Sequence, residues 1–502
     1  MKLNELIKPD GARIIGDADI EVSGISFDSR AVKKGDLFAA IPGEHVDGHS
    51  FIGKAVEAGA CVILAERPAK DGALATQVIV PDIRAALSSI SNLFFGEPSK
   101  KLTLIGITGT NGKTTTTYLL ESIFKAAGLN PGVIGTVNYR YGDNTFPAPH
   151  TTPQSPELHK ILKEMCDAGV THCVMEVSSH SLQQKRVADC AFKAGLFTNL
   201  THDHLDYHKT MDEYFKAKSI LFGLAGENSG KTIVNIDDEW GRLLKKNYPG
   251  SLAFSLNAGA DVYPKKYSLL DGRTEADIVT PAGEIKISSH LVGEYNLQNI
   301  LSAVSAAFAL GIDNKKIELG VASLERVPGR LEKIEAGGAK NFRAYVDYAH
   351  TGDALERALN ALIPISSGRI ITVFGCGGNR DRLKRPKMGG IAGRLSDITV
   401  ITSDNPRDED PLEIIMEIEA GMEGVKKCGP RDPLAGKCYT AIPDRTEAIR
   451  KAVREARDGD TILVAGKGHE DYQIVKGKKT HFSDFEALRL AIDELSGAVT
   501  VH

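Results

Sequence analysis

A glycine-rich segment, GITGTNGKTTTT at residues 106–117, has the composition of a loop that binds phosphate groups. Its glycines allow backbone N–H groups to converge on phosphate oxygens, and Lys113 is placed to reach the β- and γ-phosphates. The Thr114 hydroxyl is a candidate Mg²⁺ ligand. Five residues, rather than the usual four, separate the first glycine from the Gly-Lys-Thr, so the loop is a variant. Because an apolar run precedes the loop and a helical pattern follows it, we predict that it binds ATP or GTP; the alternative is a glycine turn without a ligand.

A carboxylate ends a second apolar run. Glu176 belongs to the segment MEVSSH at 175–180. Carboxylates at the ends of strands in nucleotide-binding sheets hold Mg²⁺ in the Walker-B arrangement. We therefore predict that Glu176 is a metal ligand; the alternative is that it caps the turn after the strand.

The segment NLTHDHLDYHKT at 199–210 is the densest group of metal-ligating side chains. Its order is similar to the H-x-H-x-D-H pattern of dinuclear hydrolases of the metallo-β-lactamase superfamily. Tyr207 follows Asp206 where that pattern requires a final histidine, so the pattern is incomplete. We favour a milder interpretation, in which one imidazole binds the nucleotide's metal or the substrate phosphates. The other histidines then cap helices or lie at the surface.

Composition restricts the classes of protein. The chain has 502 residues, 42% of them apolar, and a formal charge of −4, so no general positive field attracts nucleic acid or an anionic membrane. The seven cysteines contain no C-x-x-C pair, which argues against a zinc ribbon or a secreted disulfide framework. No leader-like or membrane-spanning apolar run is present. We expect a cytoplasmic protein with small-molecule substrates.

The elements that position these residues are predicted to be parallel strands. Apolar, β-branched runs recur, each followed by glycine or polar residues and a helical pattern, at 102–109, 173–178, 195–200, 370–378, 397–404 and 461–468. This alternation indicates an α/β fold with active groups at the carboxyl ends of the strands. Pattern breaks at 97–103 and 327–341 suggest three domains, 1–99, 100–332 and 333–502.

Eleven ordered blocks resemble the Mur ligases, the ATP-dependent amide-forming family of peptidoglycan precursor synthesis. The blocks are GTNGKT (109–114), HTTP (150–153), MEVSSH (175–180), NLTHDHLDYH (199–208), YFKAK (214–218), GEYNLQN (293–299), PGRLE (328–332), DYAH (347–350), GCGGNRD (375–381), DNPR (404–407) and GKGHE (466–470). The resemblance implies a small N-terminal α/β UDP-binding domain, a central P-loop parallel-sheet ATPase domain and a C-terminal Rossmann-like domain for the incoming amino acid. It also implies ATP and Mg²⁺ as cofactors. We expect a monomer.

Within the family, DNPR and GKGHE resemble the members that add meso-diaminopimelate to UDP-N-acetylmuramoyl-L-alanyl-D-glutamate. Diaminopimelate differs from lysine by a distal carboxylate, so selection needs a fixed cation that lysine leaves unpaired. Arg407 can supply a fork-shaped donor. The resemblance completes this site with Arg380, Asp404, Asn405, Pro406, Gly466 and Glu470. The alternative for DNPRDEDP is a solvated acidic turn.

The resemblance assigns the remaining site residues. Lys218 matches the lysine that becomes a carbamate, although composition alone suggests an exposed helix lysine. The metal ligands that the resemblance implies are Thr114, Glu176, His204 and carbamylated Lys218. The catalytic residues that it implies are Lys113, Lys218, Arg330 and His204. The nucleotide contacts are Gly109, Thr110, Asn111, Gly112, Lys113, Thr114, Thr115, Asn296, Asn299, Arg330 and Asp347. The contacts with the UDP-muramoyl-dipeptide are Ser29, Arg30, His45, His49, Thr151, Thr152, Ser178 and Arg186.

The implied reaction transfers the γ-phosphoryl group to the D-glutamate γ-carboxylate, and the diaminopimelate amine then displaces phosphate from the acyl phosphate. We expect the domains to close around the substrates, with hinges near 98–103 and 330–340. The alternatives are a lysine-adding Mur ligase, a ligase like folylpolyglutamate synthase, and a P-loop switch that binds nucleotide without ligation.

Overall fold

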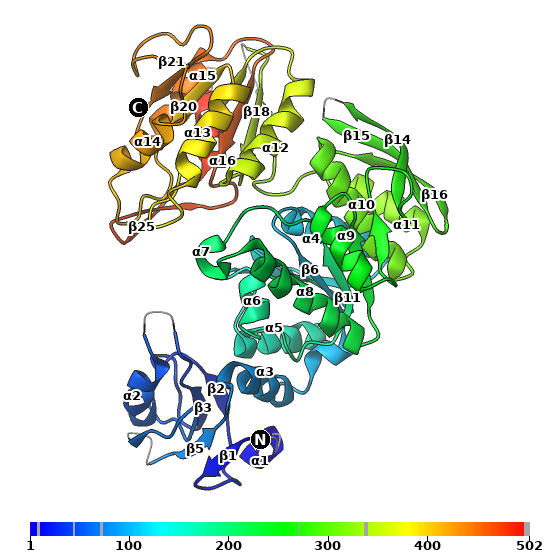
Figure 1. Cartoon of the computed structure of the whole chain (residues 1–502), viewed down its shortest axis with the longest axis vertical. Coiled ribbons are helices and arrows are strands. Elements are labelled where there is room, and N and C mark those ends of the chain that lie inside the picture. The colour runs from blue at the N-terminus through cyan, green and yellow to red at the C-terminus, as the bar shows by residue number, and fades with distance from the viewer. Residues whose placement is uncertain (8–10, 44–45, 71–73, 271, 336–339, 496–502) are drawn as a thin grey trace.

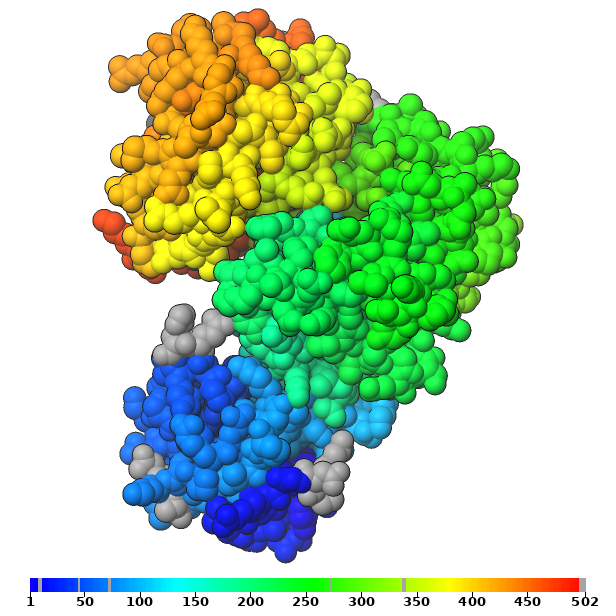
Figure 2. Space-filling view, in the orientation of Figure 1, coloured from blue at the N-terminus to red at the C-terminus, as the bar shows by residue number. Residues whose placement is uncertain are grey.

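The computed structural model describes residues 1–502 except 8–10, 44–45, 71–73, 271, 336–339 and 496–502. Three sheet-containing regions follow one another along the chain (Figure 1). The N-terminal and C-terminal regions both border the central region, and an open recess lies between them on the face shown in Figure 2. This arrangement confirms the prediction of a three-domain α/β protein.

The N-terminal region is built on a five-stranded sheet. Its order is β1 (Arg13–Ile15), β5 (Thr76–Ile79), β4 (Val62–Ala65), β3 (Asp36–Ala39) and β2 (Gly24–Ser26), with β1 antiparallel to β5 and the others parallel. The helices are α1 (Leu3–Leu6), α2 (Ile52–Glu57) and α3 (Ile83–Phe94), with a 3-10 turn at Gly48–Phe51. Because the strands alternate their side chains between two covered faces, the region has two apolar clusters.

The central region contains an eight-stranded sheet. Its order is β13 (Leu252–Phe254), β12 (Lys231–Asn235), β11 (Phe192–Phe197), β6 (Thr103–Thr108), β10 (His172–Glu176), β7 (Pro131–Ile134), β8 (Asn138–Tyr141) and β9 (Asn144–Pro147). The strand β6, which leads into the phosphate loop, pairs in parallel with β10 and β11 at the middle of the sheet. The loops that follow these three strands therefore meet at one edge.

Helices cover both faces of this central sheet. They are α4 (Lys113–Ala126), α5 (Ser155–Asp167), α6 (Ser179–Gln183), α7 (Leu205–His208), α8 (Met211–Glu227), α9 (Glu239–Asn247), α10 (Glu294–Ala309) and α11 (Asn314–Ser323). A three-stranded antiparallel sheet, β14 (Tyr263–Leu270), β15 (Arg273–Thr280) and β16 (Gly283–Ser289), adds apolar side chains to the core beside α4, α10 and α11. This extra sheet was not predicted from the sequence.

The C-terminal region has a seven-stranded sheet. Its order is β17 (Glu332–Ile334), β18 (Arg343–Asp347), β23 (Thr461–Ala465), β19 (Ile370–Phe374), β20 (Ile398–Ile401), β22 (Cys438–Ala441) and β21 (Lys426–Lys427). The strand β17 is antiparallel to β18, and the others run parallel. A boundary between the sheets of the central region and the sheet of the C-terminal region therefore falls before Glu332.

Helices and one hairpin complete the C-terminal region. The helices are α12 (Gly352–Leu362), α13 (Lys384–Leu395), α14 (Pro411–Glu419), α15 (Arg445–Glu455) and α16 (Asp484–Leu495), with a 3-10 turn at Ile363–Ile365. The hairpin β24 (Tyr472–Val475) and β25 (Lys478–His481) follows the GKGHE segment. Two apolar clusters lie on opposite faces of the sheet, as expected for strands covered on both sides.

Candidate active site

The phosphate loop links β6 to α4 in a conformation that requires glycine. Gly109 and Gly112 have φ values of +146° and +88°. A Cβ atom would lie 1.9 Å from Thr198 Oγ1 at Gly109 and 2.3 Å from Asn299 Oδ1 at Gly112. The loop is held from the segment after β11, where Thr198 Oγ1 donates to the Asn111 carbonyl (2.6 Å). These contacts hold the phosphate loop, which is one residue longer than usual, in place.

Lys113, Thr114 and Glu176 meet at this loop. Lys113 Nζ donates to the carbonyls of Gly109 (2.9 Å) and Thr110 (3.0 Å). Burial lowers the pKa of Lys113, and Arg330 lowers it further, whereas Glu176 opposes the shift. Glu176 is 1% exposed, and β10 places it beside β6, opposite Ile107. The predicted cation and carboxylate therefore share one site.

The Glu176 carboxylate is surrounded by hydroxyl groups. Thr114 Oγ1 donates to Glu176 Oε2 at 3.2 Å, and Thr136 donates from Oγ1 (2.9 Å) and from its backbone N–H (3.0 Å). Arg330 Nη2 donates to Thr114 Oγ1 at 3.1 Å. A carboxylate beside a threonine hydroxyl is the oxygen donor set that Mg²⁺ prefers, so these residues fit the implied ion. Thr136 was not predicted as a site residue, because it lies outside the motif blocks.

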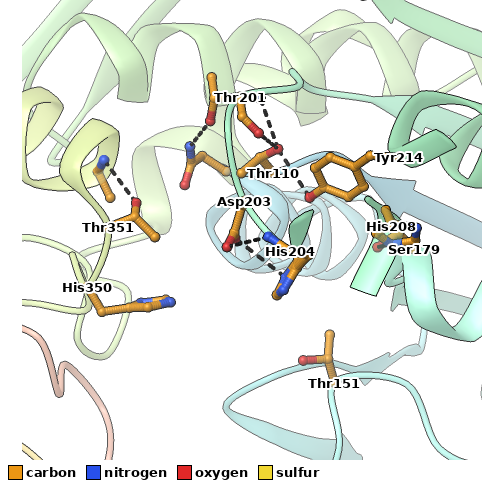
Figure 3. Close-up of polar contacts among 12 residues, drawn as sticks. Thr110, Thr151, Ser179, Thr201, Asp203, His204, His208, Tyr214, His350 and Thr351 are labelled. Atoms are coloured by element: carbon orange, nitrogen blue, oxygen red, sulfur yellow. Dashed lines mark hydrogen bonds and ion pairs between the residues drawn. The ribbon is translucent and has the colours of Figure 1, made fainter. Parts of the chain in front are cut away.

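Lys218 is buried rather than exposed. Its side chain on α8 is 2% exposed, and Nζ donates to the Gly109 carbonyl at 2.9 Å, the same oxygen that Lys113 contacts. Burial and the charge of Lys113 lower the pKa of Lys218 well below its usual value, against an opposing effect of Asp203. The interpretation of Lys218 as an exposed helix lysine is therefore wrong. Tyr214, one turn earlier on α8, places its hydroxyl 3.3 Å from Thr110 Oγ1 (Figure 3).

The histidine segment lies beside the phosphate loop. His204 precedes α7 with a φ of +54°, and Asp203 accepts from its backbone N–H (2.9 Å) and lies 3.4 Å from its Nε2 (Figure 3). Burial lowers the pKa of His204, so the neutral, metal-binding form is favoured. His208 is 3% exposed and bonds to Ser179 Oγ at 2.8 Å, so it neither caps a helix nor lies at the surface.

The described residues contain no group of three or more His, Cys, Asp and Glu side chains that could hold a metal ion. The described residues therefore do not assemble the dinuclear hydrolase centre that the histidine segment suggested. Glu176 and His204 still line one cavity together with Thr114. Lys218 does not line it and reaches the loop from behind, through Gly109.

We call this space the phosphate-loop cavity; its volume is about 240 Å³. The predicted nucleotide contacts in its wall are Thr110, Asn111, Gly112, Lys113, Thr114, Thr115, Asn299, Arg330 and Asp347. Gly109 and Asn296 are not in the wall: Asn296 is buried and donates to the Val292 carbonyl (2.8 Å). Three further residues in the wall were not predicted from the sequence: Tyr295 and Tyr348, which lie within the GEYNLQN and DYAH blocks, and Arg357, which lies outside every block.

The C-terminal region supplies one wall of the phosphate-loop cavity. Thr351, Ala354, Arg357 and Ala358 lie at the start of α12 or on it. In Figure 3 the His350 ring extends toward the loop side, and the Thr351 hydroxyl accepts from the Ala354 N–H at the start of α12 (3.3 Å). One carboxylate connects the two regions. Asp353 Oδ2 accepts from Asn111 Nδ2 (2.8 Å) and Thr201 Oγ1 (3.2 Å), and Arg357 Nε donates to both of its oxygens (3.1 Å).

The residues expected to contact the muramoyl-dipeptide divide into two groups. Thr151 and Ser178 line the phosphate-loop cavity, whereas Thr152 is buried below it and Arg186 Nη1 donates to the Thr152 carbonyl (2.9 Å). Ser29, Arg30 and His49 lie in the N-terminal region and line neither this cavity nor the DNPR cavity described below. Arg30 is paired with Asp28 (2.7 Å), and His49 Nε2 contacts the Arg67 carbonyl (3.0 Å). His45 lies outside the described residues.

A second cavity, of about 700 Å³, lies between the histidine segment and the DNPR segment; we call it the DNPR cavity. The predicted residues in its wall are Arg380, Asp404, Asn405, Arg407, Gly466 and Glu470. Pro406 is not in the wall, but its carbonyl lies 1.9 Å from the position of a Cβ at Gly378 and so requires glycine there. His204 and His350 line this cavity and the phosphate-loop cavity, so the two spaces are adjacent.

The DNPR turn is a buried structure. Asp404 and Asn405 are 6% and 4% exposed, so the solvated-turn alternative is wrong for this part of DNPRDEDP, whereas Asp408 and Asp410 in its second half are exposed. Arg407 has a φ of +53°, and the hairpin holds its backbone, since Arg407 N–H donates to the Ile474 carbonyl at 3.0 Å. Its guanidinium donates once to the Gly378 carbonyl, at 2.7 Å. The Arg407 guanidinium therefore faces the cavity as a planar donor group. Most of its N–H groups make no bond to the described residues.

The fold and the two adjacent cavities define a nucleotide-dependent enzyme in which a phosphate site adjoins a site with fixed charges of both signs. Family models match in chain order: the "Mur ligase family, catalytic domain" at residues 21–95, the "Mur ligase middle domain" at 107–307 and the "Mur ligase, glutamate ligase domain" at 329–468. The chain belongs to the Mur ligase family.

Curated relatives match nearly the whole chain. The UDP-N-acetylmuramoyl-L-alanyl-D-glutamate–2,6-diaminopimelate ligase of Geobacter metallireducens is 44% identical, with 99% of each chain covered. The protein of the same name from Clostridium tetani is 42% identical, covering 99% of this chain and 100% of its own. A solved structure of a ligase with this name is 31% identical and has a TM-score of 0.69 over 99% of each chain.

The MurF ligase of Thermotoga maritima in complex with ADP is 20% identical and has a TM-score of 0.64, covering 96% of this chain and 99% of its own, which shows a shared fold. In the part of the chain that the structure describes, no helix combines the length and apolar character needed to cross a membrane.

Proposed function

We propose that this Mur ligase, an ATP-dependent amide ligase, joins diaminopimelate to the D-glutamate γ-carboxylate of UDP-N-acetylmuramoyl-L-alanyl-D-glutamate in peptidoglycan precursor synthesis. One observation carries the proposal: the phosphate-loop cavity and the DNPR cavity share His204 and His350, so an activated carboxyl group and an incoming amine can meet between them. Relatives with this named activity are 42–44% identical over nearly the full chain.

The phosphate-loop cavity fits the first step. A carboxylate does not react with an amine at a useful rate, because its leaving group would be oxide. Transfer of the γ-phosphoryl group from ATP forms an acyl phosphate and ADP, and phosphate then leaves when the amine attacks. Lys113 and Arg330 line this cavity together with Thr114, where they would stabilise charge on the transferred group.

Mg²⁺ and a modified lysine complete the proposed site. Thr114 and Glu176 would hold the ion, with His204 as a further ligand, and the ion would neutralise charge on the phosphate oxygens. A carbamate on Lys218 would convert a cation beside Lys113 into an anion. The two ammonium groups share the single carbonyl of Gly109, which supports the loss of one positive charge when the site is active.

The DNPR cavity fits an amino acid with charges of both signs at its distal end. Arg380 and Arg407 offer cationic donors for a carboxylate, and Glu470 offers an acceptor for an ammonium group. Lysine has no distal carboxylate, so it would leave the Arg407 guanidinium without its partner. These charges favour diaminopimelate over a lysine-adding activity.

The test is phosphate release by purified protein with ATP, Mg²⁺ and the nucleotide-dipeptide, compared among diaminopimelate, lysine, and glutamate with a folate acceptor. We expect release and a lengthened peptide with diaminopimelate. Preference for lysine, or for the folate acceptor, would replace this function by one of the alternative ligases. Nucleotide binding without acceptor-dependent phosphate release would instead support a nucleotide switch.

We also propose the domain limits 1–99, 100–332 and 333–502, with hinges at the two junctions and closure around the substrates. The separate sheets support this division, with β17 moving the second limit a few residues earlier. A monomer in the cytoplasm remains our prediction. Seven free cysteines support a reducing compartment.

A further inference from the structure

Lys467 is a fully buried cation beneath the DNPR cavity. Its side chain is 0% exposed and does not line the cavity. Nζ donates to Asn405 Oδ1 (3.0 Å) and to the Tyr472 carbonyl (2.7 Å), and lies 3.2 Å from Asp404 Oδ1 and 3.9 Å from Glu470 Oε2. Lysine is rarely buried so completely, and an ammonium group tolerates burial only when it is well paired.

The contacts of Lys467 determine the orientation of the Asn405 amide. Asn405 Oδ1 accepts from Lys467 Nζ and from the Ile474 N–H (3.0 Å). With the oxygen facing two donors, the amide nitrogen must face the other way, and Nδ2 donates to Glu470 Oε2 at 2.9 Å. A chain of contacts therefore runs from Lys467 through Asn405 to the carboxylate that lines the cavity.

The charges around Lys467 leave an excess of one negative charge. Asp404 and Glu470 contribute two carboxylates against the single ammonium group. The neighbouring cation Arg445 is occupied, because it forms two bonds of 2.7 Å with Asp484. The excess charge lies where Glu470 meets the cavity, which suits a ligand's ammonium group.

We propose that Lys467 is a positioning residue that holds Glu470 in place, and ionised, as the acceptor for the distal ammonium group of diaminopimelate. This inference rests on the proposed function, because it names the part of the substrate that Glu470 binds. Lys467 acts through Asn405 and Glu470 and does not touch the substrate.

The pKa of Glu470 supports the geometric argument. Burial raises it, as does Asp404, whereas Lys467, the bond from Asn405 and Arg407 lower it. Other groups that interact with Glu470 are Tyr348, Tyr472 and Arg445. Removing Lys467 raises the pKa of Glu470 further, so this carboxyl group becomes protonated at a higher pH. As the solution is acidified, the protein without Lys467 then loses binding of an ammonium group at a higher pH than the wild type does.

The experiment compares Lys467→Met with Lys478→Met, an exposed lysine on the nearby hairpin. Phosphate release is measured against diaminopimelate concentration at several pH values with the other substrates saturating. For Lys467→Met we expect KM for diaminopimelate to rise about 10- to 100-fold, the loss of one charge-assisted contact. We also expect the acid limb of kcat/KM to move to higher pH, with KM for ATP within about twofold because the phosphate-loop cavity is untouched. Lys478→Met should behave as wild type.

A double-mutant cycle separates positioning from general damage. If Lys467 acts through Glu470, adding Lys467→Met to Glu470→Gln should raise KM little further. Multiplied effects, or an unchanged KM and pH profile in folded Lys467→Met, would overturn the inference. If Lys467→Met does not fold, Asn405→Ala provides the test with Lys467 present: the same shift of the acid limb is expected, and an unshifted limb contradicts the inference. A wild-type protein without diaminopimelate-dependent phosphate release contradicts the proposed function itself, whereas an active wild type with an unaltered Lys467→Met contradicts only the role of Lys467.

Discussion

Lysines that are buried or partly buried lie beside both the phosphate-loop cavity and the DNPR cavity, but the partners of these lysines differ. Lys113 and Lys218 share a backbone carbonyl, and the pKa values of both are lowered, Lys218 strongly. Lys467 instead lies between the carboxylates of Asp404 and Glu470. The phosphate-loop cavity presents Lys113, Arg330 and Arg357 to a triphosphate. Beside the DNPR cavity, the two carboxylates around Lys467 leave one negative charge for a ligand's ammonium group.

This difference reflects what each cavity must do. Phosphoryl transfer moves negative charge through the phosphate-loop cavity, so cations must meet that charge there. Selection of an amino acid requires a rigid pattern of charges, which buried ion pairs and hydrogen bonds hold in one arrangement. We therefore expect substitutions at the phosphate loop to reduce kcat and substitutions in the DNPR cavity to change KM and selectivity.

The largest effect is expected for Lys113→Ala. It removes a cation that we propose stabilises the transferred phosphoryl group, so kcat should fall about 10³-fold. Phosphate release at saturating substrates measures the change. Lys125→Met on the same helix, an exposed lysine paired with Glu121, serves as the control. A kcat within tenfold of wild type for Lys113→Ala would place phosphoryl stabilisation elsewhere.

Lys218→Ala should reduce kcat about 10²-fold, because the proposed carbamate anion is lost from the site. Acetate or another short carboxylate should restore part of the activity by occupying the vacated space. The exposed Lys216 on the same helix, paired with Glu213, gives the control variant Lys216→Ala. Mass spectrometry of native protein in bicarbonate would detect the modification, and activity that survives in Lys218→Ala without added carboxylate would argue against it.

Arg407→Ala tests the opposite cavity. The ratio of kcat/KM for diaminopimelate over lysine should fall about 10- to 100-fold, because the distal carboxylate loses its guanidinium partner. The kcat at saturating diaminopimelate should change much less. The assay uses the amino-acid panel with the exposed Arg431→Ala as the matched control. Retained discrimination would remove Arg407 from the selecting role.

The smallest effect is expected at the contact between the central and C-terminal regions. Asp353→Ala removes the acceptor that Asn111 and Thr201 share, so KM for ATP should rise about two- to fivefold, the range of a partly exposed polar contact. Glu356→Ala on the same helix, whose partner Arg394 belongs to the C-terminal region, is the control. An equal effect in both variants would show that damage to α12, rather than the contact between regions, is responsible.

Much of the candidate site could be predicted because its residues belong to contiguous blocks. The phosphate loop is one example: glycine at 109 and 112 is required by local backbone conformation, and Lys113 follows directly. Parallel strands were also predictable, since strands such as β6, β10 and β23 are continuous apolar runs. The fully buried pairing of Lys467 could not be read from GKGHE, because Glu470 is its one partner within that segment and the others are residues 404, 405 and 472.

The sequence by itself determined the family, the parallel α/β organisation and the chemical groups of the phosphate loop and the DNPR turn, because propensity, glycine placement and motif order are local properties of the chain. Tertiary structure alone decided which of these groups share a cavity and what charge surrounds them. It buried Lys218 behind Gly109, joined Asn111 to Asp353 across 242 residues, and enclosed Lys467 between carboxylates. Burial and pairing depend on segments brought together by folding, and these set the pKa and orientation of a side chain whose identity is all that the sequence records.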